Sequence, residues 1–170
     1  TMCAVNLSGC YGVEIENCDL FNFPESIISI SNIFSGGVAT AWNDTTNRHY
    51  IHHCKIHGAQ AHGWGYGILQ HNSNGKSLAA LVEACEIYDC RHEIACDHGT
   101  LANYELRYCN IGDAWYYLSN TGAKTYSGQI DAHGGGTNAS IAAGVHYEIH
   151  HNTITSNPGK PNAGIRGIPK

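Results

Sequence analysis

One eight-residue pattern recurs along this chain and restricts the folds that the chain can adopt. In each copy, an aliphatic residue comes three positions before a small polar residue, and a second aliphatic residue follows two positions after it. The copies span residues 13–20, 49–56, 80–87, 104–111 and 147–154. The small polar position is occupied by Cys18, Cys54, Cys85, Cys109 and Asn152. We therefore interpret the chain as one structural unit used five times.

A second short apolar segment follows every copy and centres on an isoleucine. These isoleucines are Ile28, Ile68, Ile94, Ile130 and Ile165. The distance between copies varies from 24 to 43 residues, which excludes helical repeats of constant length but suits a solenoid whose loops differ in size. Short apolar segments bounded by Gly, Asn and Asp predict strands, so each unit reads as strand, turn, second strand and long loop.

Stacking equivalent strands about 4.8 Å apart makes parallel sheets. We therefore predict an all-β fold, a right-handed parallel β-helix of about five coils in which residues 1–170 form a single domain. The last expected strand ends close to Lys170, which leaves little chain to cover an open end. We expect the β-helix to be uncapped or to belong to a longer chain, and Thr1 shows neither a signal peptide nor an initiator methionine.

The register of the stack follows from charge. If Ile15 and its equivalents point inward, the neighbouring outward column runs through Glu16, His52, Glu83, Arg107 and His150. This column alternates acid with base over most of its length, which a register shifted by one residue would not do.

The chain has eight cysteines, and four of them occupy the repeated small polar position. A buried Asn at such a position can bridge the backbones of adjacent coils, whereas a thiol packs as a small hydrophobe. We expect these four to be buried free thiols in preference to disulfides between coils or metal ligands. Cys3, Cys10, Cys90 and Cys96 either form two local disulfides or stay free.

Composition excludes two kinds of partner. The net charge of -5 includes no basic block, so we expect no nucleic-acid partner. No apolar run reaches about 18 residues, so we expect no membrane span.

Polar residues that follow the second strands are the best candidates for chemistry. Alignment on the central isoleucines stacks His71, Asp97 and His133, with Asp131 on the same segment as His133. Arg91, His92 and His98 lie beside this row in sequence. Imidazoles and carboxylates one coil apart can act as general acid and base, can hold a metal, or can satisfy one another as a polar ladder.

Trp64 and Trp115 fall on long loops of this scaffold. Aromatic rings there suit stacking on sugar faces, and they equally suit covering the ends of a small core.

Four segments carry a resemblance to known proteins: residues 91–95, 104–108, 130–134 and 147–154. The chain resembles the right-handed parallel β-helix superfamily of pectate-lyase-like proteins over nearly its whole length. Over residues 91–154 it is similar to the disaggregatase-related surface proteins of archaea and bacteria. The resemblance implies an extracellular or cell-surface location and a polysaccharide ligand. The acidic clusters of pectate lyases and polygalacturonases do not stand out here, so the resemblance supports the fold more than the activity.

These observations lead to two main hypotheses. In the first, the chain hydrolyses or eliminates within an envelope polysaccharide: Asp97 and Asp131 are the acid and base, His71, His92 and His133 orient them or bind substrate, and Arg91 pairs with an anionic sugar. His98, Trp64 and Trp115 contribute to substrate binding. In the second, it is a structural sheath, stalk or filament subunit that self-associates through open β-helix ends. A non-catalytic sugar-binding module is a third reading. We assign no cofactor and no metal ligand.

Overall fold

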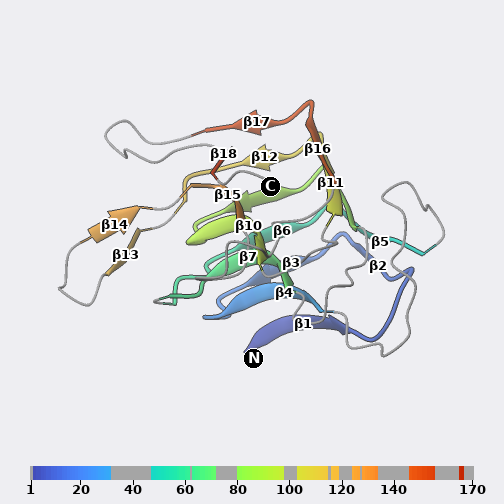
Figure 1. The fold of residues 1–170 in the computed structure, drawn as a ribbon, viewed down its shortest axis with the longest axis horizontal. Helices are drawn as coiled ribbons and strands as arrows, with labels where there is room; N and C mark the ends of the chain where they lie inside the picture. The colour runs from blue at the N-terminus through green and yellow to red at the C-terminus, as the bar shows by residue number, and fades with distance from the viewer. Residues whose placement is uncertain are drawn as a thin grey trace.

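The computed structural model describes residues 2–31, 47–61, 63–71, 80–97, 103–114, 116–118, 124–126, 128–133, 146–155 and 165–166. These residues form three parallel sheets and one antiparallel hairpin. The hairpin pairs β13 (Tyr116–Leu118) with β14 (Lys124–Tyr126) and lies to one side of the sheets in Figure 1.

Each sheet collects equivalent strands from successive coils. The six-stranded sheet consists, in order, of β1 (Cys3–Ser8), β4 (Ser26–Ser31), β7 (Tyr66–His71), β10 (His92–Asp97), β15 (Ile130–His133) and β18 (Ile165–Arg166). The β2 sheet consists of β2 (Glu14–Glu16), β5 (His49–His52), β8 (Ala80–Glu83), β11 (Asn103–Arg107) and β16 (His146–His150). The β3 sheet consists of β3 (Asp19–Phe21), β6 (Lys55–His57), β9 (Glu86–Tyr88), β12 (Asn110–Ile111) and β17 (Thr153–Ile154).

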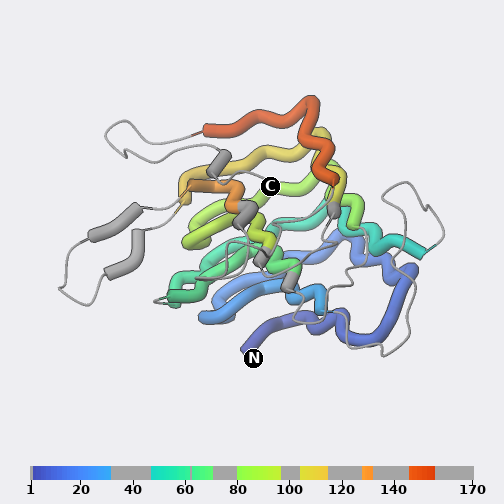
Figure 2. The backbone as a smooth tube through the Cα atoms, viewed as in Figure 1, coloured from blue at the N-terminus to red at the C-terminus, as the bar shows by residue number. Residues whose placement is uncertain are grey.

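The tube in Figure 2 winds from the blue coil at the N-terminus to the red strands at the opposite end of the stack. In every sheet, neighbouring strands come from neighbouring coils and pair in parallel. The predicted all-β parallel β-helix of about five coils is therefore confirmed.

The structure corrects the number of strands in each coil from two to three. Each eight-residue copy divides into a strand of the β2 sheet and a strand of the β3 sheet. The residue between them takes a left-handed backbone conformation, with φ of 53° at Asn17 and 52° at Ala84. The strands of the β3 sheet hold only two or three residues, too few to show an alternating pattern in the sequence. The repeat pattern did not predict β1, which pairs with β4.

The predicted register is confirmed across the β2 sheet. Ile51 pairs with Ile15 and Val82, and Leu106 pairs with Val82 and Ile149. The outward column also holds, because Glu83 pairs with His52 on one side and Arg107 on the other. Its charges meet as expected: Arg107 Nε lies 2.9 Å from Glu83 Oε1.

Columns of aliphatic side chains fill the interior of the coils. Ile27, Ile28, Ile51, Ile56, Ile87, Leu106 and Ile130 are completely buried. Since each coil contributes one residue to each column, the core is continuous along the stack and every coil depends on its neighbours for burial.

The cysteine column lies at the corner between the β2 and β3 sheets. Each of the eight cysteines is a free thiol. The burial predicted for the four in the column holds for Cys54, Cys85 and Cys109, whereas Cys18 on the first coil of the column is half-buried. Cys109 Sγ donates to the carbonyl of Arg107 at 3.2 Å and reaches the Val82 carbonyl of the preceding coil at 3.7 Å. The long second distance indicates weak bridging between coils, in keeping with the poor donor strength of a thiol.

Asn152 closes the column with stronger contacts. Its Oδ1 accepts from the Cys109 amide at 2.8 Å, and its Nδ2 donates to the Leu106 carbonyl at 2.8 Å. We expect Asn152→Ala to lower the free energy of unfolding by about 2 kcal/mol, since two hydrogen bonds of about 1 kcal/mol each are lost. Asn152→Cys should cost clearly less, because a thiol serves at the equivalent position of the other coils. Urea unfolding of both variants checks this, and equal losses for Ala and Cys would contradict it.

Candidate functional site

The predicted polar row forms on the six-stranded sheet. Asp97 pairs with His71 on one side and with His133 on the other, and His71 pairs with Ser31. The expected stacking of His71, Asp97 and His133 is thus confirmed for the backbone. The side chains of these three residues lie outside the described part of the structure.

Asp131 lies on the outer face of the same sheet. Ile68, Ile94 and Ile130 belong to the main core, whereas Leu69 and Ala95 belong to a separate apolar cluster with Tyr66. Asp131 pairs with Ala95, and alternation along the strands gives it the same outward face. Its side chain is nevertheless only 3% exposed.

Asp131 contacts the imidazole of His92, which is completely buried. His92 Nε2 lies 3.3 Å from Asp131 Oδ2, and His92 Nδ1 lies 2.7 Å from the Gly128 carbonyl. A carbonyl only accepts, so Nδ1 must carry a proton and donate it. The contact between Nε2 and Oδ2 is within ion-pair distance but does not meet the geometry of a hydrogen bond. It places a buried imidazole and a buried carboxyl side by side, next to the row at Asp97.

Tyr66 gathers three of the residues predicted to bind substrate. Its ring stacks on His92 with centroids 5.7 Å apart, and Trp64 meets it edge-on at 6.2 Å. The Arg91 guanidinium lies 5.7 Å from the ring centroid, and Arg91 Nη1 donates to the Tyr66 hydroxyl at 3.2 Å. We name Trp64, Tyr66, Arg91, His92 and Asp131 the Tyr66 cluster. Trp64 is its exposed member, at 44%.

Gly65 allows this close arrangement. Its φ is +99°, and a Cβ there would lie 2.7 Å from the Ala59 carbonyl oxygen and 3.0 Å from Arg91 Cβ. The glycine therefore lets Trp64 and Arg91 approach the same ring.

Sequence reasoning missed Tyr66 as the centre of the cluster. A signal was present in the run Gly63-Trp64-Gly65-Tyr66-Gly67, which places two aromatic rings among three glycines. Tyr66 pairs in register with His92, but that proximity depends on which residues of two distant segments are aligned. Of the other predicted binding residues, His98 and Trp115 lie outside the described residues.

Glu93 is the most unusual ionisable group near the site. It follows His92 in sequence but is completely buried in the interior. Its Oε1 accepts from the Cys90 amide at 3.4 Å, and within the described ranges Oε2 has no hydrogen-bond partner. Burial, reinforced by Asp89 and Asp113, holds the pKa of the Glu93 carboxyl well above its usual range.

This shift predicts a pH-dependent stability. With a folded-state pKa above the unfolded value of about 4.3, the stabilisation is full below pH 4.3 and is lost as pH rises toward the folded pKa. Glu93→Gln removes the titrating group, so its free energy of unfolding relative to the parent chain should rise by up to about 1.4 kcal/mol per pH unit above pH 4.3. Urea unfolding across this pH range measures the difference. Glu16→Gln, at an exposed position, is the matched control, and a pH-independent difference for Glu93→Gln would contradict the assignment.

Two groups of three side chains on the β2 sheet have the composition of metal sites. Within the described residues, the ligand atoms of Glu14, Glu16 and His52 lie within 4.8 Å of one another, as do those of Glu105, Glu148 and His150. Glu105 already contacts Arg48 at 2.9 Å and Arg107 at 2.7 Å, and these cations oppose a metal ion. Glu14 contacts His52 at 3.0 Å in an exposed setting. We interpret both groups as parts of the charged outward surface of the β2 sheet.

No protein-family model, curated protein or solved structure matches the chain. In the part of the chain that the structure describes, no helix is long and apolar enough to cross a membrane.

Proposed function

We propose that this protein is an extracellular carbohydrate-active β-solenoid that binds an envelope polysaccharide on the outer face of the six-stranded sheet and hydrolyses it. The observation that carries the proposal is the Tyr66 cluster: a buried carboxylate and imidazole, 3.3 Å apart, lie beside an aromatic wall. Aromatic rings with a few polar groups are the usual lining of sugar sites.

The backbone register places the two aspartates near each other on neighbouring strands. Asp97 pairs with His133, and Asp131 lies two residues before His133 on the same strand. Two residues along a strand and one strand across correspond to about 8 Å between Cα atoms. We propose hydrolysis with inversion, in which the two carboxyl groups lie about 6.5–9.5 Å apart, and the configuration of the product tests it.

The contact with His92 decides how we divide the two roles. We assign the general acid to Asp131, because the imidazole of His92 lies 3.3 Å from its Oδ2 and can exchange a proton with it. Asp97 is then the base that activates water. Because Asp131 is only 3% exposed, turnover requires a movement that exposes its carboxyl group to the substrate. Trp64 is the residue that a sugar meets first.

The setting outside the cell is part of the proposal. Five of the eight cysteines are buried, and burial raises the pKa of the Cys54 thiol to about 11. Little of the Cys54 thiol is then ionised at neutral pH, so a free thiol at this position is compatible with an oxidising environment. We propose that the coils are right-handed, because crossovers between parallel strands are right-handed in about 98% of cases. The relationship to pectate-lyase-like and disaggregatase-related proteins stays a proposal that rests on the sequence resemblance.

The direct test incubates the protein with neutral and acidic polysaccharides and follows new reducing ends, unsaturated uronate absorbance and the anomeric configuration of the product by NMR. New reducing ends with inverted configuration are the expected result. Unsaturated products would show that the protein cleaves by elimination and not by hydrolysis. Binding without turnover would show that the protein is a non-catalytic sugar-binding module. Absence of both, together with concentration-dependent polymerisation, would overturn the proposal in favour of a structural subunit.

A further inference from the structure

A column of stacked aromatic rings runs along the outer face of the β3 sheet. Phe21, His57 and Tyr88 hold equivalent positions on β3, β6 and β9. The Phe21 and His57 centroids are 5.2 Å apart and those of His57 and Tyr88 are 4.7 Å apart, with 6° between the ring planes in both pairs. The column therefore presents flat rings at the spacing of the coils.

Gly112 interrupts this column at the next coil. The register that pairs Ile111 with Ile87 places Gly112 opposite Tyr88, and its amide donates to the Ile87 carbonyl at 2.8 Å. A Cβ at Gly112 would lie 2.6 Å from Tyr88 Cβ, so this position excludes a side chain. Thr155 follows on the coil beyond. The missing ring leaves an open depression of about 250 Å³ between Tyr88 and Thr155.

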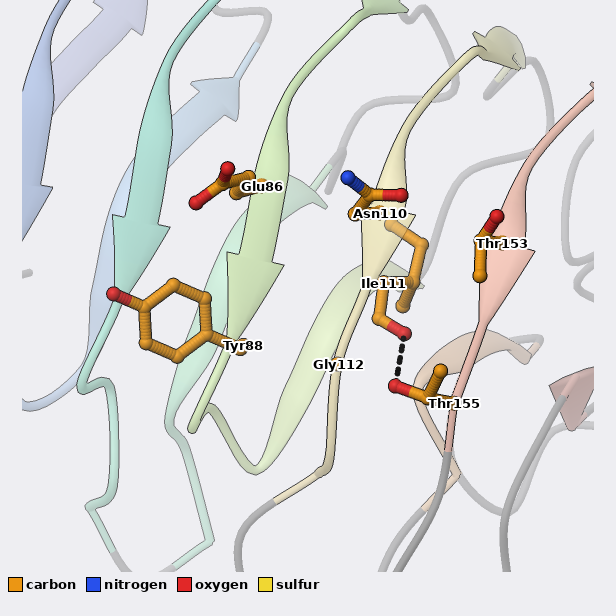
Figure 3. Close-up of a pocket in the computed structure, with 7 residues that line it drawn as sticks. All are labelled: Glu86, Tyr88, Asn110, Ile111, Gly112, Thr153 and Thr155. Atoms are coloured by element: carbon orange, nitrogen blue, oxygen red, sulfur yellow. Dashed lines mark hydrogen bonds between the residues drawn. The ribbon is translucent and has the colours of Figure 1, made fainter.

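Figure 3 shows this depression and its lining. The Tyr88 ring extends away from Gly112, on the side opposite Thr155, and leaves the space above the glycine open. The Thr155 hydroxyl donates to the Ile111 carbonyl at 3.4 Å and closes the far side.

Hydrogen-bonding groups line the other side of the depression. Glu86, Asn110 and Thr153 are register partners on three adjacent strands, and their side chains form a row across Figure 3. All three are exposed. The row offers carboxylate oxygens as acceptors, an amide that both donates and accepts, and a hydroxyl, which together match the hydroxyl groups of a sugar ring.

The charge of the lining indicates which class of sugar the depression can bind. Among the described residues that line the depression, Glu86 is acidic and none is basic. Lys55 Nζ lies 3.5 Å from Glu86 Oε2 and pairs with it. A neutral sugar gains the contact with Tyr88 and the hydrogen bonds of the lining without a charge, whereas a uronate would have to compete with Glu86 for Lys55.

We propose that the depression at Gly112, flanked by Tyr88 and lined by Glu86, Asn110 and Thr153, binds one neutral pyranose unit of a glycan in the place of the missing ring. This site lies on the β3 sheet, away from the Tyr66 cluster on the six-stranded sheet. Binding at this site requires no catalysis, so the inference goes beyond the proposed function. The site would hold a long glycan on the β3 sheet while the Tyr66 cluster on the six-stranded sheet acts on it.

The test uses the full chain and NMR titration with neutral hexaoses of glucose, galactose, mannose and xylose, with hexagalacturonate as the charged comparison. At least one neutral hexaose should shift the backbone amide of Gly112 and the side-chain amide of Asn110. Hexagalacturonate should leave both unchanged. Tyr88→Ala should weaken binding of that hexaose about tenfold, since the apolar contact with the Tyr88 side chain that borders the depression is lost.

Phe21→Ala is the matched control. Phe21 belongs to the same column and is 46% exposed, but it does not line the depression, so its loss should change the affinity less than twofold. Asn110→Ala should weaken binding without affecting the Tyr88 ring. The proposal is overturned if no neutral hexaose shifts Gly112 and Asn110, or if Phe21→Ala weakens binding as much as Tyr88→Ala. Neither outcome bears on turnover at Asp97 and Asp131, which is read from reducing ends.

Discussion

Asp131→Asn is expected to lower kcat on the substrate polysaccharide at least a hundredfold. Asparagine keeps the shape of the side chain but can neither donate the acid proton nor share one with His92 Nε2, which lies 3.3 Å from Asp131 Oδ2. General acid catalysis contributes about 10²–10⁴-fold to a rate, so most of the turnover should disappear. Asp97→Asn should cause a loss of the same order. The double variant should be little worse than either single one, because the two groups act in one step.

Reducing-end assays with the parent chain and the three variants measure this effect, and circular dichroism confirms that each variant folds. Asp19→Asn is the control, because Asp19 is an exposed carboxylate that pairs with His57 on the β3 sheet. The pH profile of kcat gives a second readout, since the limb that reports the acid should disappear in Asp131→Asn. Turnover that survives in the double variant would show that these aspartates are not the acid and base.

Ile87→Ala is expected to lower the free energy of unfolding by about 3–4 kcal/mol, the usual cost of truncating a fully buried isoleucine. Ile87 is 0% exposed on the middle coils, and its column continues through Ile56 and Ile111 on either side. The cavity left by the truncation cannot collapse easily, because ladder hydrogen bonds fix the neighbouring strands on both sides.

Ile154→Ala is the matched control within the same column. Ile154 is 36% exposed on β17, so its truncation should cost about 1 kcal/mol. Urea unfolding monitored by circular dichroism compares the two variants. Similar losses for Ile87→Ala and Ile154→Ala would contradict the expectation that the cost of truncation follows the burial of the side chain along this column.

The sequence allowed the parallel stack and its register to be predicted because both arise from local, repeated signals. The aliphatic column through Ile15, Ile51 and Val82 and the outward column through Glu16 and His52 each repeat in kind, so aligning the copies aligns the coils. The row of His71, Asp97 and His133 followed from the same alignment.

Three features were beyond that reasoning. The third strand of each coil is too short to alternate, and the corner that separates it from its neighbour depends on a left-handed backbone at residues as different as Asn17 and Tyr108. Asp131 lies on the outer face of its strand and is nevertheless only 3% exposed, which the register alone does not reveal. The depression at Gly112 forms because Gly112 has no side chain at the position where the preceding coil has Tyr88.

The sequence by itself determined that this chain is a parallel β-solenoid and which residues share each column, because a side chain's place in a coil is repeated every time the coil is repeated. Only the tertiary structure decided which of these residues meet as a site. Tyr66, His92 and Asp131 lie on three different coils, and so do Tyr88, Gly112 and Thr155. Contacts of this kind depend on burial and on the direction of side chains from different coils, and the sequence pattern of a single repeat predicts neither.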